Sequence, residues 1–293
     1  VVLNSSLREG GTVHMLMGHA HHALGDTAER DRHYRETVRK GDEKWRSLLQ
    51  IGLFHTDRSG DLPLARRYLD LARQEAPDEP AVWFMLSKWH HHKGNRGEEK
   101  SCLRRLWELG TEDPAMLNRL ATLSLEANDL ETAERALTDL FKVAPDHLPG
   151  LCNLAVLRHR LNDPAAAVSA CERAIAIDPK IADPWLTLGE VSLSLGDPEN
   201  AASFFKRVLA LENGSLRALL YLCEADLRRN DLEGFIGCCD RLLAILDLPR
   251  ERTLHTLGDL TSTFREIQAS LAPAEEFASQ SARILSLLPG SSS

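Results

Sequence analysis

A two-residue pattern recurs along this chain and determines where its helices end and begin. Its seven occurrences are Gly25-Asp26, Gly60-Asp61, Gly94-Asn95, Asn128-Asp129, Asn162-Asp163, Gly196-Asp197 and Asn230-Asp231. The first residue is always Gly or Asn, which readily adopt the left-handed conformation that ends a helix. The second is Asp or Asn, whose side-chain oxygen accepts the free N–H groups at the start of a helix. Each pair therefore predicts the end of one helix and the start of the next.

The spacing of these pairs predicts a repeat array. The first step is 35 residues and the five that follow are 34 residues each. A fixed period of this length with two helices per unit is typical of helical repeats. When the Gly or Asn is placed at position 15, the repeats start at Gly11, Arg46, Pro80, Pro114, Leu148, Ala182 and Leu216. We expect a first helix over about positions 2–14 of each repeat and a second over about 17–30.

Other repeat positions carry a packing pattern. Positions 4 and 7 are mostly large and apolar, whereas positions 8 and 20 are mostly small, which lets the two helices cross closely. Pro at position 32 of three repeats ends the second helix. Two repeats depart from the pattern. Repeat 2 has Gly52 and Leu53 at positions 7 and 8, and repeat 1 has Arg30 and Tyr34 where Ala and a Phe-like residue are usual, so we expect repeat 1 to be diverged or only partly packed.

At these positions the chain resembles the tetratricopeptide repeat (TPR) family, over residues 11–249. The resemblance implies an all-α fold, a right-handed α-solenoid of antiparallel helix pairs with seven tandem repeats. Residues 1–10 are expected to be an N-terminal linker. Residues 250–288 are expected to form a degenerate helical hairpin that caps the array, because a terminal repeat must cover an exposed apolar face. Residues 289–293 are expected to be a tail.

The resemblance also implies where a partner binds. In the family, peptide ligands usually touch positions 2, 5, 6, 9, 12 and 13 of the first helices, which form a concave groove. The residues that we expect at this groove are Phe54, Phe84, Lys88, His91, Asn118, Arg119, Asn153, Arg160, Glu190, Tyr221 and Glu224. Such side chains can hydrogen-bond an extended peptide; the alternative is a solvated helix face. Replacing Arg119 or Asn153 by Ala is expected to weaken binding with little change in melting temperature.

Histidines are concentrated at the N-terminal end, where nine of the twelve lie within the first 92 residues. His22, Asp57 and His91 occupy position 12 of consecutive repeats, and His19 lies one turn from His22. Neighbouring helices pack about 8–10 Å apart, whereas zinc ligands lie about 2 Å from the ion. We therefore expect no metal site and no cofactor. Solvated or partner-facing histidines are favoured, with a pH-sensitive surface as the alternative.

Composition limits the function further. The net charge is −8, and residues 101–200 carry 9 Lys and Arg against 16 Asp and Glu, which argues against nucleic-acid binding. No apolar stretch is long enough to span a bilayer. The six cysteines form no C-x-x-C pair, so we expect reduced, packed thiols and a cytoplasmic location.

No catalytic motif accompanies the repeats: the sequence has no Gly-rich phosphate loop, no G-x-S-x-G and no H-E-x-x-H. We therefore predict a non-enzymatic scaffold for protein–protein interaction that binds a peptide or protein partner. The alternative is a substrate-presenting or regulatory TPR arm of a larger enzyme, such as a glycosyltransferase, because the chain starts at Val1 and not at Met. The sequence leaves the oligomeric state open.

Overall fold

The computed structural model describes residues 2–246, 264–265, 267–269 and 275–287. Within these ranges all regular structure is helical and no strand occurs. The chain forms two compact units, residues 1–143 and residues 144–293, which we call the N-terminal unit and the C-terminal unit.

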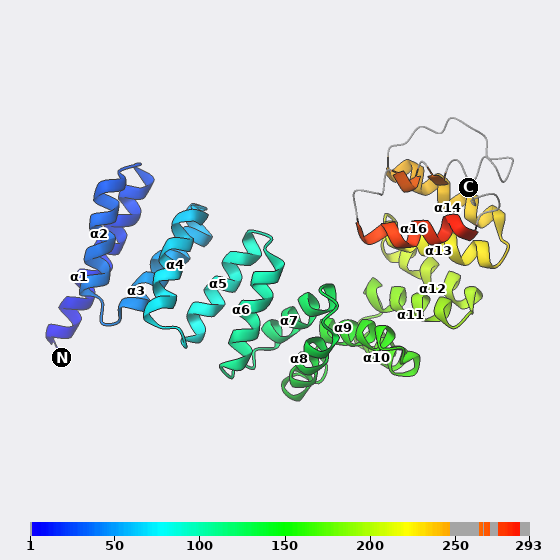
Figure 1. Ribbon diagram of the computed structural model, residues 1–293, viewed down its shortest axis with the longest axis horizontal. Helices are drawn as coiled ribbons and strands as arrows, with labels where there is room; N and C mark the ends of the chain where they lie inside the picture. Colours follow the sequence, from blue (N-terminus) through cyan, green and yellow to red (C-terminus); the bar gives the residue numbers. More distant parts are fainter. Residues whose placement is uncertain (1, 247–263, 266, 270–274, 288–293) are drawn as a thin grey trace. The chain divides into compact units, whose positions relative to one another are not determined.

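The N-terminal unit consists of four antiparallel helix pairs (Figure 1). In chain order its helices are α1 (Val2–Ala23), α2 (Thr27–Lys40), α3 (Lys44–Phe54), the short π-helix η1 (His55–Ser59), α4 (Leu62–Glu75), α5 (Pro80–His92), α6 (Arg96–Glu108), α7 (Pro114–Glu126) and α8 (Leu130–Val143). Each α-helix contacts the next one along the chain, and the first helices α3 and α5 also contact each other. This stacking buries apolar side chains between successive pairs, as the repeat pattern predicts.

The C-terminal unit also contains helix pairs, in which successive helices contact each other. Its helices are α9 (Leu148–Arg160), α10 (Pro164–Ile177), α11 (Ala182–Ser194), α12 (Pro198–Leu211), α13 (Leu216–Arg228), α14 (Leu232–Ile245) and α16 (Glu275–Leu287). The core of this unit includes Phe205, Phe235, Phe264 and Ile284. Helix α16 packs on α13 (Figure 1), so the last described helix lies on the first helix of the seventh repeat.

The recurring pairs act as the sequence predicts. All seven Gly or Asn residues at position 15 have positive φ angles, from 55° at Asn128 to 77° at Gly196. At position 16, the carboxylates of Asp26, Asp61, Asp129, Asp163, Asp197 and Asp231 each accept the backbone N–H three residues on. Asn95 is the exception and makes no side-chain cap. Each turn is therefore determined by local chemistry.

Repeat 1 differs from its expectation. Tyr34 is fully buried, and a Cβ added to Gly18 would lie 2.3 Å from the Tyr34 ring, so α1 and α2 are tightly packed. The expectation of a partly packed first repeat is wrong, because Gly18 makes room for the aromatic ring. Helix α1 also begins at Val2, so most of the expected linker over residues 1–10 is helical.

Repeat 2 contains the extra residue of the 35-residue step. The π-helix η1 holds one more residue per turn than an α-helix, and such turns occur mainly as single insertions. The residues of α3 that precede this insertion therefore occupy repeat positions one higher than the sequence numbering gave them. Ile51 is fully buried and Gly52 lies against Leu69, whereas Leu53 is 38 % exposed. Gly52, not Leu53, is therefore the small residue of this repeat, which corrects the register expected from the sequence.

The structure describes only part of the expected capping hairpin. Most of its first half, including residues 250–263, lies outside the described residues, as does the expected tail over 289–293. Phe264 and Ile267 are buried in the core of the C-terminal unit, as is Ile284 of α16. The described part of this segment therefore covers apolar surface of the seventh repeat.

Candidate functional site

The first helices of the N-terminal unit expose apolar side chains at groove positions. Phe84 of α5, at position 5, is 53 % exposed. Leu16 of α1 stands at position 6 and Leu53 of α3 at position 9 in the corrected register, and both are exposed. Neither leucine is among the groove residues expected from the sequence. Leu16 could have been found from its position alone, whereas Leu53 was hidden by the shift at η1.

Phe54, an expected groove residue, is half-buried. Its ring stacks on His19 of α1, with ring centroids 3.6 Å apart and an interplanar angle of 6°. Burial of this histidine lowers its pKa to about 4, which favours the neutral ring at pH 7. Phe54 therefore joins α1 to α3 and presents only part of its surface to a ligand.

The charged groove residues of the N-terminal unit are paired with neighbouring helices. Lys88 Nζ lies 2.7 Å from Asp57 Oδ2, which joins α5 to η1. Arg119 of α7 donates two hydrogen bonds to Glu99 of α6, of 2.7 and 2.9 Å, and also contacts His91. Glu99 is only 4 % exposed, so Arg119 balances a buried carboxylate. These cations hold adjacent helices together before any ligand binds.

In the C-terminal unit three of the expected groove residues, Glu190, Tyr221 and Glu224, have partners within the protein. Glu190 of α11 pairs with Arg217 of α13 at 2.8 Å. Tyr221 stacks on Phe205, with ring centroids 5.2 Å apart, and burial raises its pKa to about 12. Glu224 is fully buried and accepts hydrogen bonds from Arg228 and from Arg283 of α16. Its assignment to an open groove is therefore wrong, because α16 covers it.

The remaining expected groove residues lie on the first helices of their repeats, one in the N-terminal unit and two in the C-terminal unit. Asn118 is half-buried on α7 of the N-terminal unit. Asn153 and Arg160 lie on α9 of the C-terminal unit, where Asn153 is half-buried and Arg160 exposed. Their roles in binding stay predictions.

The histidines gather in a way that the repeat positions did not predict. His22, Asp57 and His91 have separate neighbours: His22 contacts His55, Asp57 pairs with Lys88, and His91 lies 3.3 Å from Glu99. Two other sets place their possible metal-binding atoms within 4.8 Å of one another, namely His21, Glu29 and His33, and His22, His55 and Asp61. These two sets could have been found in the sequence by comparing residues on helices that face each other. Comparing equal positions of successive repeats does not reveal them.

The six cysteines are free and buried. Burial raises the pKa of the Cys152 and Cys171 thiols to about 12, which disfavours the reactive thiolate. They pack as small apolar side chains. Among the described residues, no helix combines the length and the apolar character that a membrane span requires.

Comparison with known proteins identifies the repeat. Two family models, both of the tetratricopeptide repeat, match residues 118–182 and 192–254. The superkiller complex protein 3 of Mus musculus is 26 % identical over 186 residues, a match that covers 60 % of this chain and 12 % of that protein. This chain thus corresponds to a small part of that relative's length.

Solved structures share the fold at low sequence identity. A tetratricopeptide repeat protein from Parabacteroides merdae superposes with a TM-score of 0.63 at 14 % identity, over 83 % of this chain and 98 % of that one. YrrB, a TPR protein with an unusual peptide-binding site, gives 0.57 at 13 % identity over 64 % and 95 %. PilW, a type IV pilus biogenesis factor, gives 0.56 at 12 % identity over 72 % and 97 %. With the repeat chemistry and the helix pairs described above, these matches lead to one conclusion: the chain is a tetratricopeptide-repeat protein.

Proposed function

We propose that this protein is a non-enzymatic scaffold that binds an extended segment of a protein partner along the first helices of its N-terminal unit. The observation that carries the proposal is the exposure of Phe84, 53 % of whose surface is open to solvent at a position that family members use for ligands. Fully burying an exposed Phe side chain contributes about 1.5–3 kcal/mol, and burying the exposed half of Phe84 contributes about half of that. An aromatic residue exposed on a ligand-binding face is therefore a strong candidate contact.

The neighbouring contacts favour an apolar ligand side chain. Leu16 and Leu53 are exposed on the first helices of the two preceding repeats. The cations Lys88 and Arg119 are already paired within the protein, so a ligand carboxylate would have to compete with Asp57 or Glu99. We infer that apolar contacts supply most of the affinity, while the paired charges orient the peptide backbone. The peptide-binding site described for YrrB supports this class of ligand.

The cellular location, the cofactor and the alternative function are also matters of proposal. We infer a cytoplasmic location from the free thiols, and we expect no organic cofactor. The alternative, a TPR arm of a larger enzyme such as a glycosyltransferase, stays a prediction, because no contact among the described residues favours it. Both alternatives use the same binding face, so the experiment below applies to either.

The experiment selects ligands and then removes the proposed contact. Random peptides are displayed on phage and selected on the purified chain, and the dissociation constants of the selected peptides are measured by fluorescence anisotropy. Phe84→Ala should weaken binding about tenfold or more, which corresponds to about 1.4 kcal/mol or more. The matched control is Leu71→Ala, because Leu71 is an exposed apolar residue on the second helix α4.

The outcomes separate binding from folding. Both substitutions remove exposed side chains, so the melting temperatures followed by circular dichroism should stay close to that of the wild type. The proposal fails if no peptide is selected, if Phe84→Ala binds as tightly as the wild type, or if Leu71→Ala causes the larger loss.

A further inference from the structure

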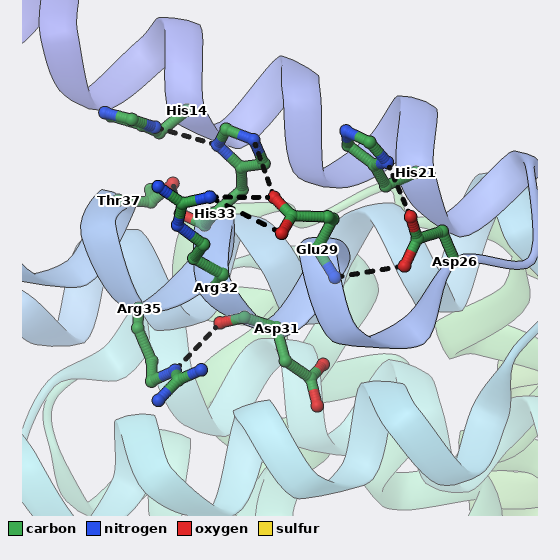
Figure 2. A network of polar contacts seen from close by, with 9 residues as sticks. All are labelled: His14, His21, Asp26, Glu29, Asp31, Arg32, His33, Arg35 and Thr37. Atoms are coloured by element: carbon green, nitrogen blue, oxygen red, sulfur yellow. Dashed lines mark hydrogen bonds and ion pairs between the residues drawn. The ribbon is translucent and has the colours of Figure 1, made fainter.

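The first helix pair brings three histidines and one glutamate together. His14 and His21 lie two turns apart on α1 and face Glu29 and His33, which lie one turn apart on α2 (Figure 2). The rings of His21 and His33 are stacked with centroids 5.4 Å apart. His33 Nε2 lies 3.9 Å from Glu29 Oε2. Spacings of seven residues on one helix and four on the other place all these groups on facing sides.

We propose that His21, Glu29 and His33 bind a divalent transition-metal ion, with zinc as the preferred ion. Two imidazoles and one carboxylate form a zinc ligand set that leaves a fourth position open. Their possible ligand atoms lie within 4.8 Å of one another. Ligand atoms of a tetrahedral zinc site are separated by about 3.3 Å, given bond lengths of about 2.0–2.1 Å. Closing this difference requires side-chain movement, and the His21 and Glu29 side chains are 27 % and 39 % exposed.

The surroundings of the cluster allow an ion to enter. His14, His21, Glu29 and His33 line one surface pocket of about 590 Å³, together with Met17, Arg32, Glu36 and Lys40. Asp26 Oδ2 lies 3.5 Å from His21 Nδ1 (Figure 2). His21 Nδ1 makes no hydrogen bond at this distance. A nearby carboxylate favours the tautomer with its proton on Nδ1, which leaves Nε2 available to a metal, as is usual around metal-bound histidines.

One charge competes with the ion for Glu29. Arg32 Nη1 lies 3.2 Å from Glu29 Oε2, but the side chains are 69 % and 39 % exposed. Exposed ion pairs of this kind contribute only about 0–1 kcal/mol. A dication that is also bound by two imidazoles therefore displaces Arg32 readily.

Lys40 opposes the metal in a different way. Its Nζ lies 2.9 Å from His14 Nε2, and His14 Nδ1 lies 2.8 Å from His33 Nδ1. An ammonium group can only donate, so a neutral His14 carries its proton on Nδ1 and donates it to His33 Nδ1. A neutral His33 then carries its proton on Nε2, the nitrogen that faces Glu29. Metal binding requires both rings to exchange tautomers without a net gain or loss of protons, and Lys40 must leave His14.

The second histidine set is less suited to a metal. Both ring nitrogens of the buried His55 already have partners, Tyr34 Oη at 2.9 Å and Ser59 Oγ at 2.7 Å. Asp61 Oδ1 accepts the Leu64 N–H at the start of α4. An ion bound to His22, His55 and Asp61 would have to break hydrogen bonds in the core, so the geometry favours the set on α1 and α2.

The test is calorimetric titration of the full chain, without an affinity tag, with zinc chloride. We expect one zinc ion per chain with a dissociation constant of about 1 μM or lower, equivalent to about −8 kcal/mol. Glu29→Gln and His33→Gln should each weaken binding about 100-fold or more, because each removes one of three ligands. Lys40→Met should tighten it, by about tenfold, since it removes the donor that holds the competing tautomer.

Two further variants locate the ion. His92→Gln is the matched control, because His92 is an exposed histidine of α5, and it should bind zinc like the wild type. His22→Gln removes a member of the second set and should also leave the affinity unchanged. Circular dichroism of each variant checks folding, and Glu29→Gln tests the ligand set at an exposed side chain even if His33→Gln is unstable.

The proposal is overturned if the wild type shows no saturable zinc binding, if Glu29→Gln retains the wild-type affinity, or if His22→Gln rather than His33→Gln abolishes binding. Visible absorption of a cobalt(II) complex gives an independent readout. A tetrahedral cobalt spectrum that disappears in Glu29→Gln supports the site, and an octahedral, water-like spectrum in the wild type contradicts it.

Discussion

Gly189 of α11 lies directly against the ring of Phe205 on α12: a Cβ added to Gly189 would come within 2.3 Å of Phe205 Cε1. Gly18 and Tyr34 have the same relationship in the first repeat. In both repeats, position 8 is a glycine and position 24, which faces it, carries an aromatic ring. The two helices of a repeat are therefore matched in size across their crossing point.

Gly189→Ala should lower the free energy of unfolding by about 1–3 kcal/mol, because the methyl group forces the Phe205 ring and the helices apart. Gly237→Ala is the matched control on α14, where an added Cβ meets nothing within 4 Å. It should raise the free energy of unfolding by about 0.5–1 kcal/mol, since Gly weakens a helix interior. Urea unfolding followed by circular dichroism measures both. Similar losses in the two variants would contradict the close contact.

Arg119→Ala should destabilise the protein, contrary to the expectation from the sequence that it affects only binding. The substitution leaves the buried Glu99 carboxylate without its two Arg119 hydrogen bonds. A buried acceptor without a partner costs about 1–3 kcal/mol. Adding Glu99→Gln should recover part of the loss, because it removes the buried charge. Thermal unfolding of the single and double variants checks this, and a wild-type melting temperature for Arg119→Ala would refute it.

Arg283→Ala should loosen α16. The fully buried Glu224 of α13 is bonded to Arg228 of its own helix and to Arg283 of α16, so Arg283 joins the two helices. Its removal leaves the Glu224 carboxylate without its hydrogen bond from α16. Limited proteolysis followed by mass spectrometry should then show faster cleavage within residues 275–287. The control is Arg241→Ala, which removes exposed hydrogen bonds to Asn213 on the same unit. Equal cleavage rates in both variants would show that Arg283 does not hold α16.

Acid should destabilise the N-terminal unit through His55. Burial lowers the pKa of His55 from 6.5 to about 4. The unfolded chain therefore takes up a proton before the folded one does, and stability present above pH 6.5 is lost progressively towards pH 4. The loss from this group amounts to about 3 kcal/mol, given 1.36 kcal/mol per pKa unit. His55 is fully buried, so solvent does not screen the effect.

His55→Gln provides the check on this pH dependence. Glutamine keeps a donor and an acceptor for Tyr34 and Ser59 but does not titrate. Urea unfolding between pH 7.5 and 5 should show a smaller decline in the variant than in the wild type. An unchanged decline would assign the acid sensitivity to other groups.

Most of the architecture could be predicted from local sequence. Asn128 and Gly196 end their helices through a positive φ angle, and Asp197 starts the next helix by accepting a nearby N–H, so no distant contact is needed. The 34-residue period then places first and second helices in order. These features depend on a few neighbouring residues, which is why a single sequence reveals them.

The register of repeat 2 could not be obtained in this way. The 35-residue step shows that one residue is inserted. From the sequence, this residue could lie in a loop or within a helix. Only the packing of Gly52 against Leu69 places the insertion in η1. The same limit applies to the candidate site, because the sequence assigns side chains to a face and does not say which of them are already paired.

The sequence alone determined the repeat, its turns and the face that carries Phe84, because backbone conformation and helical periodicity are properties of short segments. The tertiary structure decided that Arg119 balances Glu99, that α16 covers Glu224, and that His21 and His33 meet across α1 and α2. Burial and pairing depend on side chains brought together by helix packing. Such contacts leave no periodic signal in the sequence.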